Sequence, residues 1–289
     1  MLNAFTIDVE DYFHTEAMSA AVPANKWAGM ELRVERNTWK LLELLERRGV
    51  KATLFFLGWV AERCPQLVQA AAAAGHEVGC HSYSHRPVYR LTPQEFREDT
   101  RRAKDVLETI AGHRVRGYRA PSFSILQNME WARHILVEEG FIYSSSSHPI
   151  RHANYGDRLG MRLPYRDSNG LWEFPMTTWR VLGQNLPVSG GAYLRILPAS
   201  YTALGLRRAA AAGEPLMVYL HPWEIDENQP RLNAGWRSCL RQYTGLQGML
   251  GRVESLLERY AFGTVARAYR VAERSSWNQK STAMGSAIL

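Results

Sequence analysis

Short apolar runs alternate with amphipathic segments along this chain, and that alternation restricts its fold more than any other feature. Strand-like runs fall at residues 3–8, 52–57, 77–80, 116–119, 141–145, 171–174 and 216–221, and helical patterns at 34–48, 64–74, 92–111, 128–139 and 201–212. Strands that alternate with helices are typical of a parallel sheet, because each helix carries the chain back to start the next strand. With six or more such units, we expect an α/β fold whose sheet closes into a barrel.

Several helix boundaries carry residues that start or stop a helix. Gly49 and Gly75 follow two of the helical patterns, at positions where a left-handed residue often ends a helix. Thr92, Pro93 and Glu95 have the spacing of a capping box and predict the start of the helix at 92–111.

Residues 236–274 form the last patterned stretch of the chain. Apolar residues recur there at intervals of three and four, which predicts additional C-terminal helices that pack on the barrel. The stretch 275–289 is Ser-rich and aperiodic, and we expect it to be disordered. We therefore divide the chain into a barrel (1–225), a helical extension (226–274) and a disordered tail (275–289).

The net charge of the chain is concentrated in its second half. There are 35 Lys and Arg against 28 Asp and Glu, for a net charge of +7. Residues 1–149 carry 18 basic and 18 acidic side chains, whereas residues 150–289 carry 17 and 10. No basic run of five or more occurs, so a solvated helical surface is favoured over a nucleic-acid-binding arm. As a hypothesis, the surplus holds the protein near an anionic glycan or the inner membrane surface.

The cysteine content and the N-terminal segment indicate the cellular compartment in which the protein is expected. Cys64, Cys80 and Cys239 are odd in number and lack a CxxC pair, so they indicate neither a disulfide framework nor a thiolate zinc site. The N-terminal segment has no signal-peptide pattern, and no apolar run approaches the roughly 20 residues that span a bilayer. We expect a cytoplasmic protein, with peripheral membrane association as a further option.

Two groups of potential metal ligands follow predicted strands. Asp8, Glu10 and Asp11 stand at the end of the first strand, where three carboxylates repel one another unless a cation is bound; an ordinary acidic loop is the alternative. His81 and His85 follow the third strand, four residues apart, and so share a face if that segment is helical. Two imidazoles and one carboxylate are the protein ligands of many catalytic zinc sites, which leave one position open for water.

Two further polar residues leave strand ends that we expect at the same face of the barrel. Arg119 is suited to hold a carboxylate in one orientation through paired hydrogen bonds. His221 leaves a buried apolar strand and is the natural general acid, although a satisfied core histidine is the alternative.

The order and context of these residues resemble a known family. Asp8 with its acidic neighbours, His81 to His85 (HSYSH), Arg119 to Phe123 (RAPSF) and Leu220-His221-Pro222 resemble the motifs of the NodB-homology polysaccharide deacetylases, carbohydrate esterase family 4. The segments TIDVEDYFH, HPWEIDENQPR, RQYTGL and ERYAF also resemble the branch found in bacterial exopolysaccharide loci of the PEP-CTERM/exosortase type. The resemblance implies a distorted (β/α)7 barrel and metal-dependent removal of N-acetyl groups from amino sugars.

Carried over residue by residue, the resemblance assigns roles within this sequence. Asp8 is the expected base, Arg119 the residue that orients it, and His221 the expected acid, while His81 and His85 are expected metal ligands. The family commonly has adjacent aspartates, whereas this chain has Asp8-Val9-Glu10-Asp11, so Glu10 and Asp11 both remain metal candidates. Glu173 is expected to replace a family aspartate that tunes the arginine or the histidine.

Other residues are expected to contact substrate. Pro121, Phe123, Tyr193 and Trp223 are predicted to line the substrate site, and the backbone N–H of Phe123 is a candidate to stabilise an oxyanion. Aromatic residues near strand ends are as often part of the core as a platform for sugars. The expected cofactor is a divalent metal, Zn²⁺ first, although cobalt, nickel and manganese also accept this ligand set.

The predicted activity is hydrolysis of N-acetyl groups in a bacterial exopolysaccharide or its precursor. A related amide hydrolase that acts on a small ureide or amide is one alternative, because fold does not fix substrate. A glycan-binding barrel without activity is a second, but binding needs no matched base and acid. Nucleic-acid binding is disfavoured and would show a steep salt dependence.

Overall fold

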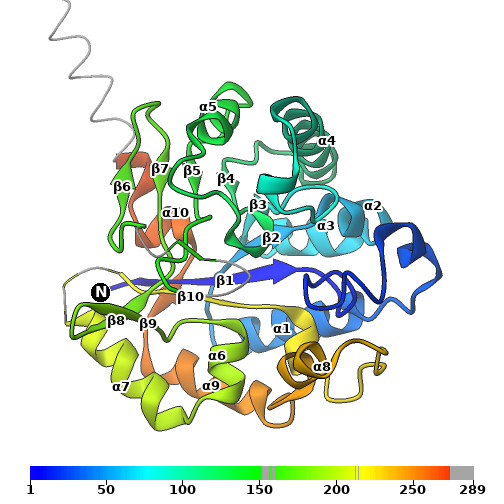
Figure 1. The fold of residues 1–289 in the computed structure, drawn as a ribbon. Helices are drawn as coiled ribbons and strands as arrows, with labels where there is room; N and C mark the ends of the chain where they lie inside the picture. The colour runs from blue at the N-terminus through cyan, green and yellow to red at the C-terminus, as the bar shows by residue number, and fades with distance from the viewer. Residues whose placement is uncertain (152–155, 158–159, 212, 214, 274–289) are drawn as a thin grey trace, which may run out of the picture.

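Seven parallel strands form the centre of the computed structural model, which describes residues 1–151, 156–157, 160–211, 213 and 215–273 (Figure 1). In sheet order they are β10 (Met217–Leu220), β1 (Asn3–Val9), β2 (Thr53–Phe56), β3 (Glu77–Cys80), β4 (Gly117–Tyr118), β5 (Tyr143–Ser144) and β7 (Trp172–Glu173). Beyond β7 the short strand β6 (Tyr165–Arg166) pairs antiparallel. In the part of the chain that is described, β7 and β10 do not pair. The sheet is therefore a curled half-barrel, which confirms the expected distorted (β/α)7 class.

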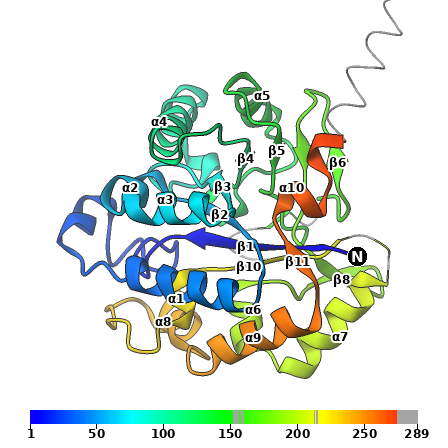
Figure 2. The same cartoon turned by 180° about the vertical axis from the view of Figure 1, so that it is seen from behind.

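Five helices pack around the first half of the sheet (Figures 1 and 2). They are α1 (Val34–Arg47), α2 (Gly58–Arg63), α3 (Pro65–Ala73), α4 (Pro93–Ala111) and α5 (Glu130–Glu138). The predicted capping box at α4 is confirmed: the Glu95 N–H donates to Thr92 Oγ1 at 3.2 Å, and the Thr92 N–H donates to Glu95 Oε2 at 2.8 Å. Local capping residues thus set this helix boundary, as the sequence predicts.

A small hairpin and two helices separate β7 from β10. The hairpin consists of β8 (Thr178–Val181) and β9 (Gln184–Pro187), which form their own antiparallel sheet. It is followed by α6 (Gly191–Ile196) and α7 (Ala199–Ala210), the second of which was expected at 201–212. Figure 1 shows β8, β9 and α7 together, on the side from which β1 starts.

The continuous helical pattern predicted for 236–274 is wrong in part. The structure has α8 (Trp236–Tyr243), α9 (Met249–Arg259), β11 (Phe262–Gly263) and α10 (Val265–Ala268) there. Gly245 and Gly248 have φ values of 75° and 84°, which end the helical path. Strand β11 then pairs in parallel with β1, so the end of the extension joins the central sheet. The predicted tail at 275–289 lies outside the described residues.

Strand register brings the predicted site residues to one edge of the sheet. Asp8 lies opposite Phe55 in β2, and Cys80 at the end of β3 lies opposite Tyr118 in β4. Residues that follow these strands, such as Glu10, His81 and Arg119, therefore emerge at the same carboxyl-terminal edge. All seven residues of β1 are buried, so the chain that carries Asp8 is fixed by core packing on both faces. Among the described helices, none is long and apolar enough to cross a membrane.

Candidate active site

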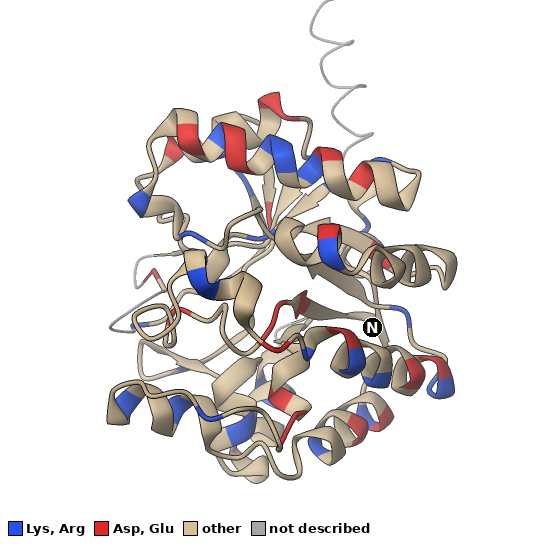
Figure 3. Ribbon diagram, turned by 90° about the vertical axis from the view of Figure 1, so that its right-hand side faces the viewer, with Lys and Arg blue, Asp and Glu red and all other residues tan. Residues whose placement is uncertain are grey.

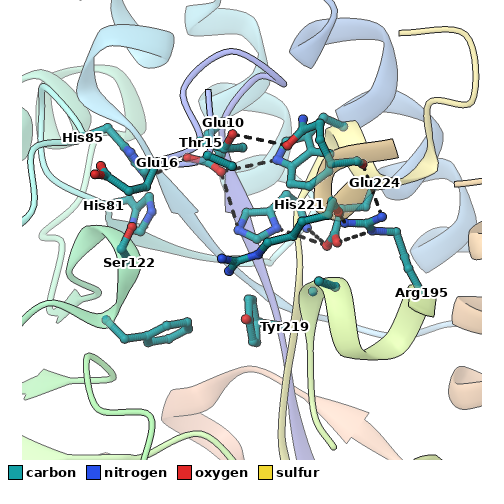
Figure 4. A pocket seen from close by; sticks show the side chains of 17 residues that line it. Glu10, Thr15, Glu16, His81, His85, Ser122, Arg195, Tyr219, His221 and Glu224 are labelled. Atoms are coloured by element: carbon teal, nitrogen blue, oxygen red, sulfur yellow. Dashed lines mark hydrogen bonds and ion pairs between the residues drawn. The ribbon is translucent and has the colours of Figure 1, made fainter. Parts of the chain in front are cut away.

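A pocket lies at the carboxyl-terminal edge of the sheet, and the predicted metal and acid residues line it (Figure 4). Figure 4 shows His81 and His85 on one side and Glu224 and Arg195 on the other, with His221 between them. The lining also draws on the loop after β1 and on the end of α8; it comprises Glu10, Thr15, Glu16, Ala17, His81, His85, Ser122, Phe123, Gly191, Ala192, Arg195, Tyr219, His221, Trp223, Glu224, Arg241 and Gln242.

Glu10, His81 and His85 form a buried cluster that could hold a metal ion. One ligand atom from each residue lies within 4.8 Å of the other two. His85 Nε2 is 2.6 Å from Glu10 Oε2. His81 Nδ1 is 2.8 Å from the carbonyl oxygen of Arg119, so that carbonyl fixes the ring and leaves Nε2 as the ligand atom. Two imidazoles and one carboxylate fit a divalent ion of the zinc type.

The protonation of this cluster suits metal binding. Burial lowers the pKa of His81 to about 4, and the charge of His85 acts in the same direction against those of Asp8 and Glu10. Burial alone would raise the pKa of Glu10, but the charge and hydrogen bond of His85 outweigh it and hold that pKa well below its usual range. A neutral imidazole and an ionised carboxylate are the forms that coordinate metals.

The two histidines do not share a helical face, contrary to the interpretation of their spacing. Ser82 and His85 adopt φ values of 62° and 52° in a loop that follows β3. Asp99 of α4 holds this loop, because its carboxylate accepts hydrogen bonds from the Tyr83 and Ser84 N–H groups at 2.8 and 3.0 Å. The pair therefore converges through a strained loop that depends on a neighbouring helix.

Asp11 does not join the cluster, so its prediction as a metal ligand does not fit the structure. Its carboxylate accepts hydrogen bonds from the N–H groups of Arg33 (2.7 Å), Val34 (2.8 Å) and Tyr12 (2.9 Å). The first two belong to the start of α1, where backbone donors have no partner within the helix. Burial raises the pKa of Asp11 to about 6 against these hydrogen bonds. Of the two candidates left open by the sequence, Glu10 is the one beside the histidines.

Asp8 lies beneath the pocket and is held by Arg119, as expected from the sequence. Arg119 Nη1 is 2.7 Å from Asp8 Oδ1 and 2.7 Å from Thr6 Oγ1. The other guanidinium nitrogens donate to the Ser145 carbonyl (3.1 Å) and to Ser145 Oγ (2.9 Å). Arg119 is fully buried, so its charge and that of Asp8 compensate each other away from water.

His221 faces both carboxylates of the first strand. Its Nε2 atom is 3.5 Å from Glu10 Oε1 and 3.9 Å from Asp8 Oδ2. Its Nδ1 atom is 3.1 Å from Glu224 Oε2, and the Trp223 ring stacks on the imidazole with centroids 5.3 Å apart. Burial lowers the pKa of His221, but the Glu224 hydrogen bond and the charges of Glu10, Glu224 and Asp8 outweigh it and raise it to about 9. The imidazole is therefore positioned and charged to donate a proton.

Glu224 and Arg195 are site residues that the sequence reasoning missed. Arg195 Nε donates to Glu224 Oε1 at 2.7 Å, and its remaining nitrogens donate to the carbonyls of Arg241 (3.0 Å), Gln242 (3.3 Å) and Thr244. The HPWE sequence puts Glu224 three residues after His221, a spacing that could have indicated the contact. Arg195 had no such indication, because its partners lie 29 to 49 residues away.

Glu173 does not contact Arg119 or His221, so its predicted tuning role is not supported by its position. Its Oε1 atom accepts the N–H groups of Ser146 and Ser147 at 2.8 and 2.9 Å. Burial raises the pKa of this carboxyl, against its hydrogen bonds to Ser144, Ser146 and Ser147 and the charge of Arg133. Glu224 occupies the position beside the histidine that was assigned to Glu173.

The four predicted substrate contacts divide into two pairs. Phe123 and Trp223 line the pocket, whereas Pro121 and Tyr193 are not among its lining residues. The Phe123 N–H donates to the Ala120 carbonyl at 3.1 Å, so it is engaged and does not point to an oxyanion. Trp223 donates through Nε1 to Glu10 Oε1 at 3.3 Å, which makes it a wall of the site.

Two family models match separate parts of the chain. Residues 28–136 match the polysaccharide deacetylase family, and residues 145–270 match a domain of unknown function, DUF3473. The first segment contains His81, His85 and Arg119, and the second contains His221, Glu224 and Arg195. Asp8 and Glu10 precede both segments.

Curated relatives match about a third of this chain. A peptidoglycan-N-acetylglucosamine deacetylase of Bacillus cereus is 36% identical over 96 residues, which are 33% of this chain and 35% of that protein. A peptidoglycan deacetylase of Helicobacter pylori is 29% identical over 109 residues, 37% of this chain and 36% of the relative. The chain thus matches only about a third of the length of these relatives.

Solved structures match over almost the whole chain. A putative polysaccharide deacetylase from Mycobacterium smegmatis superposes with a TM-score of 0.62 at 19% identity and covers 95% of this chain and 90% of its own. Puue allantoinase has a TM-score of 0.58 at 17% identity, with 94% and 88% covered. At these identities the likeness concerns the fold. The family model and the named relatives thus show similarity to polysaccharide deacetylases within the first half of the chain, and the DUF3473 match covers most of the second half.

Proposed function

We propose that this protein is a metal-dependent deacetylase that hydrolyses N-acetyl groups of amino sugars in a bacterial polysaccharide. The observation that carries the proposal is the convergence, in one pocket, of the Glu10, His81 and His85 cluster with His221, above the Asp8–Arg119 pair. A binding site needs neither a held base nor a protonated acid, whereas amide hydrolysis needs both.

Glu10, His81 and His85 would hold a divalent metal, and Zn²⁺ is the ion proposed. A metal bound there would polarise the acetyl carbonyl and lower the pKa of a coordinated water. The Arg119 carbonyl and the Asp99-held loop keep the imidazoles in place for this task.

The chain's own residues would handle the protons. Asp8, fixed by Arg119, accepts a proton as water adds to the acetyl carbon. His221, fixed by Glu224, gives its proton to the sugar nitrogen as the C–N bond breaks, because an amide anion is a very poor leaving group. The products are acetate and a free amino sugar.

The identity of the polymer is the finer part of the proposal. An exopolysaccharide or its precursor is proposed on the resemblance of TIDVEDYFH, HPWEIDENQPR, RQYTGL and ERYAF to the PEP-CTERM/exosortase branch. Peptidoglycan is the competing polymer, because named relatives act on it. A cytoplasmic location, peripheral to the membrane, belongs to the same proposal.

Acetate release tests the proposal. The protein is treated with a chelator, dialysed, and incubated with an N-acetylated oligosaccharide, with and without added Zn²⁺. We expect release only after metal is restored, and parallel reactions with purified peptidoglycan and with de-esterified exopolysaccharide compare the polymers. Hydrolysis of a small ureide without any glycan activity would favour the alternative amide hydrolase. Glycan binding without acetate release would favour a binding module.

A further inference from the structure

The backbone conformation singles out an exposed residue far from the pocket. Among the described residues, six that are not glycine have positive φ, and four of them lie in the pocket loops: Ser82, His85, Ser122 and Phe123. A fifth is Leu182, at the tip of the β8–β9 hairpin, with φ 47°. Such residues cost free energy and tend to persist where they serve a function.

Leu182 is unfavourable at its position for two reasons. Val181 pairs with Gln184, so Leu182 and Gly183 form a two-residue turn in which both φ values are positive, 47° and 80°. This turn strongly favours Asn-Gly or Asp-Gly. Leu182 is also 99% exposed, the highest value among the exposed large hydrophobic residues. A polar residue would suit both the turn and the solvent, so the leucine indicates a partner that accepts an apolar side chain.

The surroundings of Leu182 are apolar and basic. A hollow between the hairpin and α7 is lined by Arg162, Trp179, Arg180, Val181, Leu182, Leu204, Arg208 and Ala209. Residues 174–213 contain four arginines and no acidic residue. No ion pair with a described carboxylate involves Arg162, Arg180 or Arg208, and the charge of Arg180 adds to burial in lowering the pKa of Arg162. Arg162, Arg180 and Arg208 therefore line this hollow without an ion-pair partner among the described carboxylates.

Arginines elsewhere in the chain do have carboxylate partners. Arg47 and Arg48 at the end of α1 lie 3.8 Å from Glu254 and 2.7 Å from Glu258 of α9. Figure 3 shows acidic and basic residues interspersed along α4, the long helix at the top of that view. The hairpin region keeps its positive charge free for an external anion.

We propose that the hairpin face, defined as Leu182 with Arg162, Arg180 and Arg208, docks on an anionic lipid bilayer. Leu182 would enter the boundary between head groups and acyl chains, while the arginines contact lipid phosphates. An anionic polysaccharide would satisfy the arginines but would leave the exposed leucine unexplained, so the bilayer is favoured. The inference deepens the membrane-peripheral location named in the proposed function, and it does not depend on the proposed catalysis.

Co-sedimentation with vesicles tests the inference. We expect the full chain to bind vesicles of equal parts phosphatidylcholine and phosphatidylglycerol, and to bind phosphatidylcholine alone much more weakly. Leu182→Asn should reduce binding about tenfold, and because Asn suits the turn, its melting temperature should not fall. Arg180→Gln with Arg208→Gln should reduce binding about fivefold for each charge removed.

Matched variants make the test decisive. Arg47→Gln with Arg48→Gln removes two charges that are already paired, and Leu240→Asn removes a leucine that is 59% exposed on α8. Both should bind vesicles as the parent does. Binding that depends on Leu240 and not on Leu182, or that survives Leu182→Asn unchanged, would overturn the proposal. Acetate release from a soluble oligosaccharide is measured on every variant, so a failure of docking is seen separately from a failure of catalysis.

Discussion

Two buried arginines support the two sides of the pocket, and they do so in different ways. In the first half of the chain, Arg119 binds Asp8 directly, so one contact holds the carboxylate that is proposed as the base. In the second half, Arg195 binds Glu224, and Glu224 in turn binds His221. Arg119 thus contacts the residue that it holds, whereas Arg195 acts on His221 only through Glu224.

The DUF3473 segment contains His221 and both residues that support it. The polysaccharide deacetylase segment ends at residue 136, before His221 and both of its supporting residues. Arg195 also binds three carbonyls at the end of α8 and in the turn that follows it, those of Arg241, Gln242 and Thr244, and the side chains of Arg241 and Gln242 line the pocket. A Cβ at Gly245 in that turn would lie 2.4 Å from the Arg195 carbonyl oxygen, so only glycine fits. The second half thus supplies His221 and the buried contacts that hold it in the pocket.

Loss of the metal cluster should have the largest effect. His81→Ala removes one of two imidazoles, and we expect activity to fall by about 10³-fold or more, since a metal contributes several kcal/mol to such reactions. Metal content per protein, measured by mass spectrometry after dialysis, should fall in parallel. His76→Asn is the control, because His76 is a buried histidine that binds the Ala52 N–H at 3.0 Å, remote from the pocket lining. Full metal retention by His81→Ala would refute the ligand assignment.

The base and the acid should differ in their dependence on the leaving group. Asp8→Asn and His221→Ala should each slow amide hydrolysis by about 10² to 10⁴-fold, with metal retained. An aryl acetate has a leaving group that needs no proton, so His221→Ala should spare that ester whereas Asp8→Asn should not. Equal losses on amide and ester in both variants would mean that His221 is not the acid.

Because Glu224 acts on the substrate only through His221, substitution of Glu224 should have a smaller effect on the rate, and only on amide substrates. Glu224→Gln keeps the side-chain size but weakens the hold on His221, and we expect about a tenfold loss in kcat on the amide with little change on the aryl ester. Asp226→Asn is the matched control, because Asp226 is a buried carboxylate in the same segment that pairs with Arg33 at 2.7 Å. Both variants should lose stability, but only Glu224→Gln should change the ratio of amide to ester rates.

The pH dependence of stability tests the pairing of Glu224 with His221 without any substrate. In the metal-free protein the pKa of His221 is raised to about 9, so its stabilising contribution is complete below its ordinary pKa of about 6.5 and is lost as the pH rises through 9. Glu224→Gln should therefore cost more unfolding free energy at pH 6 than at pH 10, by about 2 kcal/mol. Urea unfolding measures the difference, and a cost independent of pH would contradict the pairing of Glu224 with protonated His221.

The sequence predicts most of the residues on the side of the pocket that holds Asp8, His81 and His85. It predicts few of those on the side that holds His221. Strand patterns place Asp8 near the end of the first buried strand and His81 and Arg119 directly after two others, and the order of these strands in the sheet follows the chain. The spacing of His81 and His85 and the family resemblance supply the rest. The choice between Glu10 and Asp11 depends on the start of α1, more than 20 residues away, which attracts Asp11. A local pattern cannot contain that contact.

On the second side, the supporting contacts are long-range and the elements are short. The hairpin, α6 and β11 have no strong periodicity, and Arg195 meets its partners only after the chain has folded back across α8. The family resemblance predicts Glu173 for this role, whereas the carboxylate that binds His221 is Glu224, only three residues after it.

The pairing of β1 with both β10 and β11 has a consequence for synthesis on the ribosome. Strand β1 is made first, yet it bonds to partners 212 and 258 residues later in the chain. At about 5 to 20 residues per second, those partners follow it by roughly ten seconds to a minute. During that interval β1, which is buried along its whole length in the folded protein, has only β2 beside it. Chaperone capture of the nascent N-terminal segment should therefore precede folding, and stop-codon truncations before residue 262 should accumulate as aggregates.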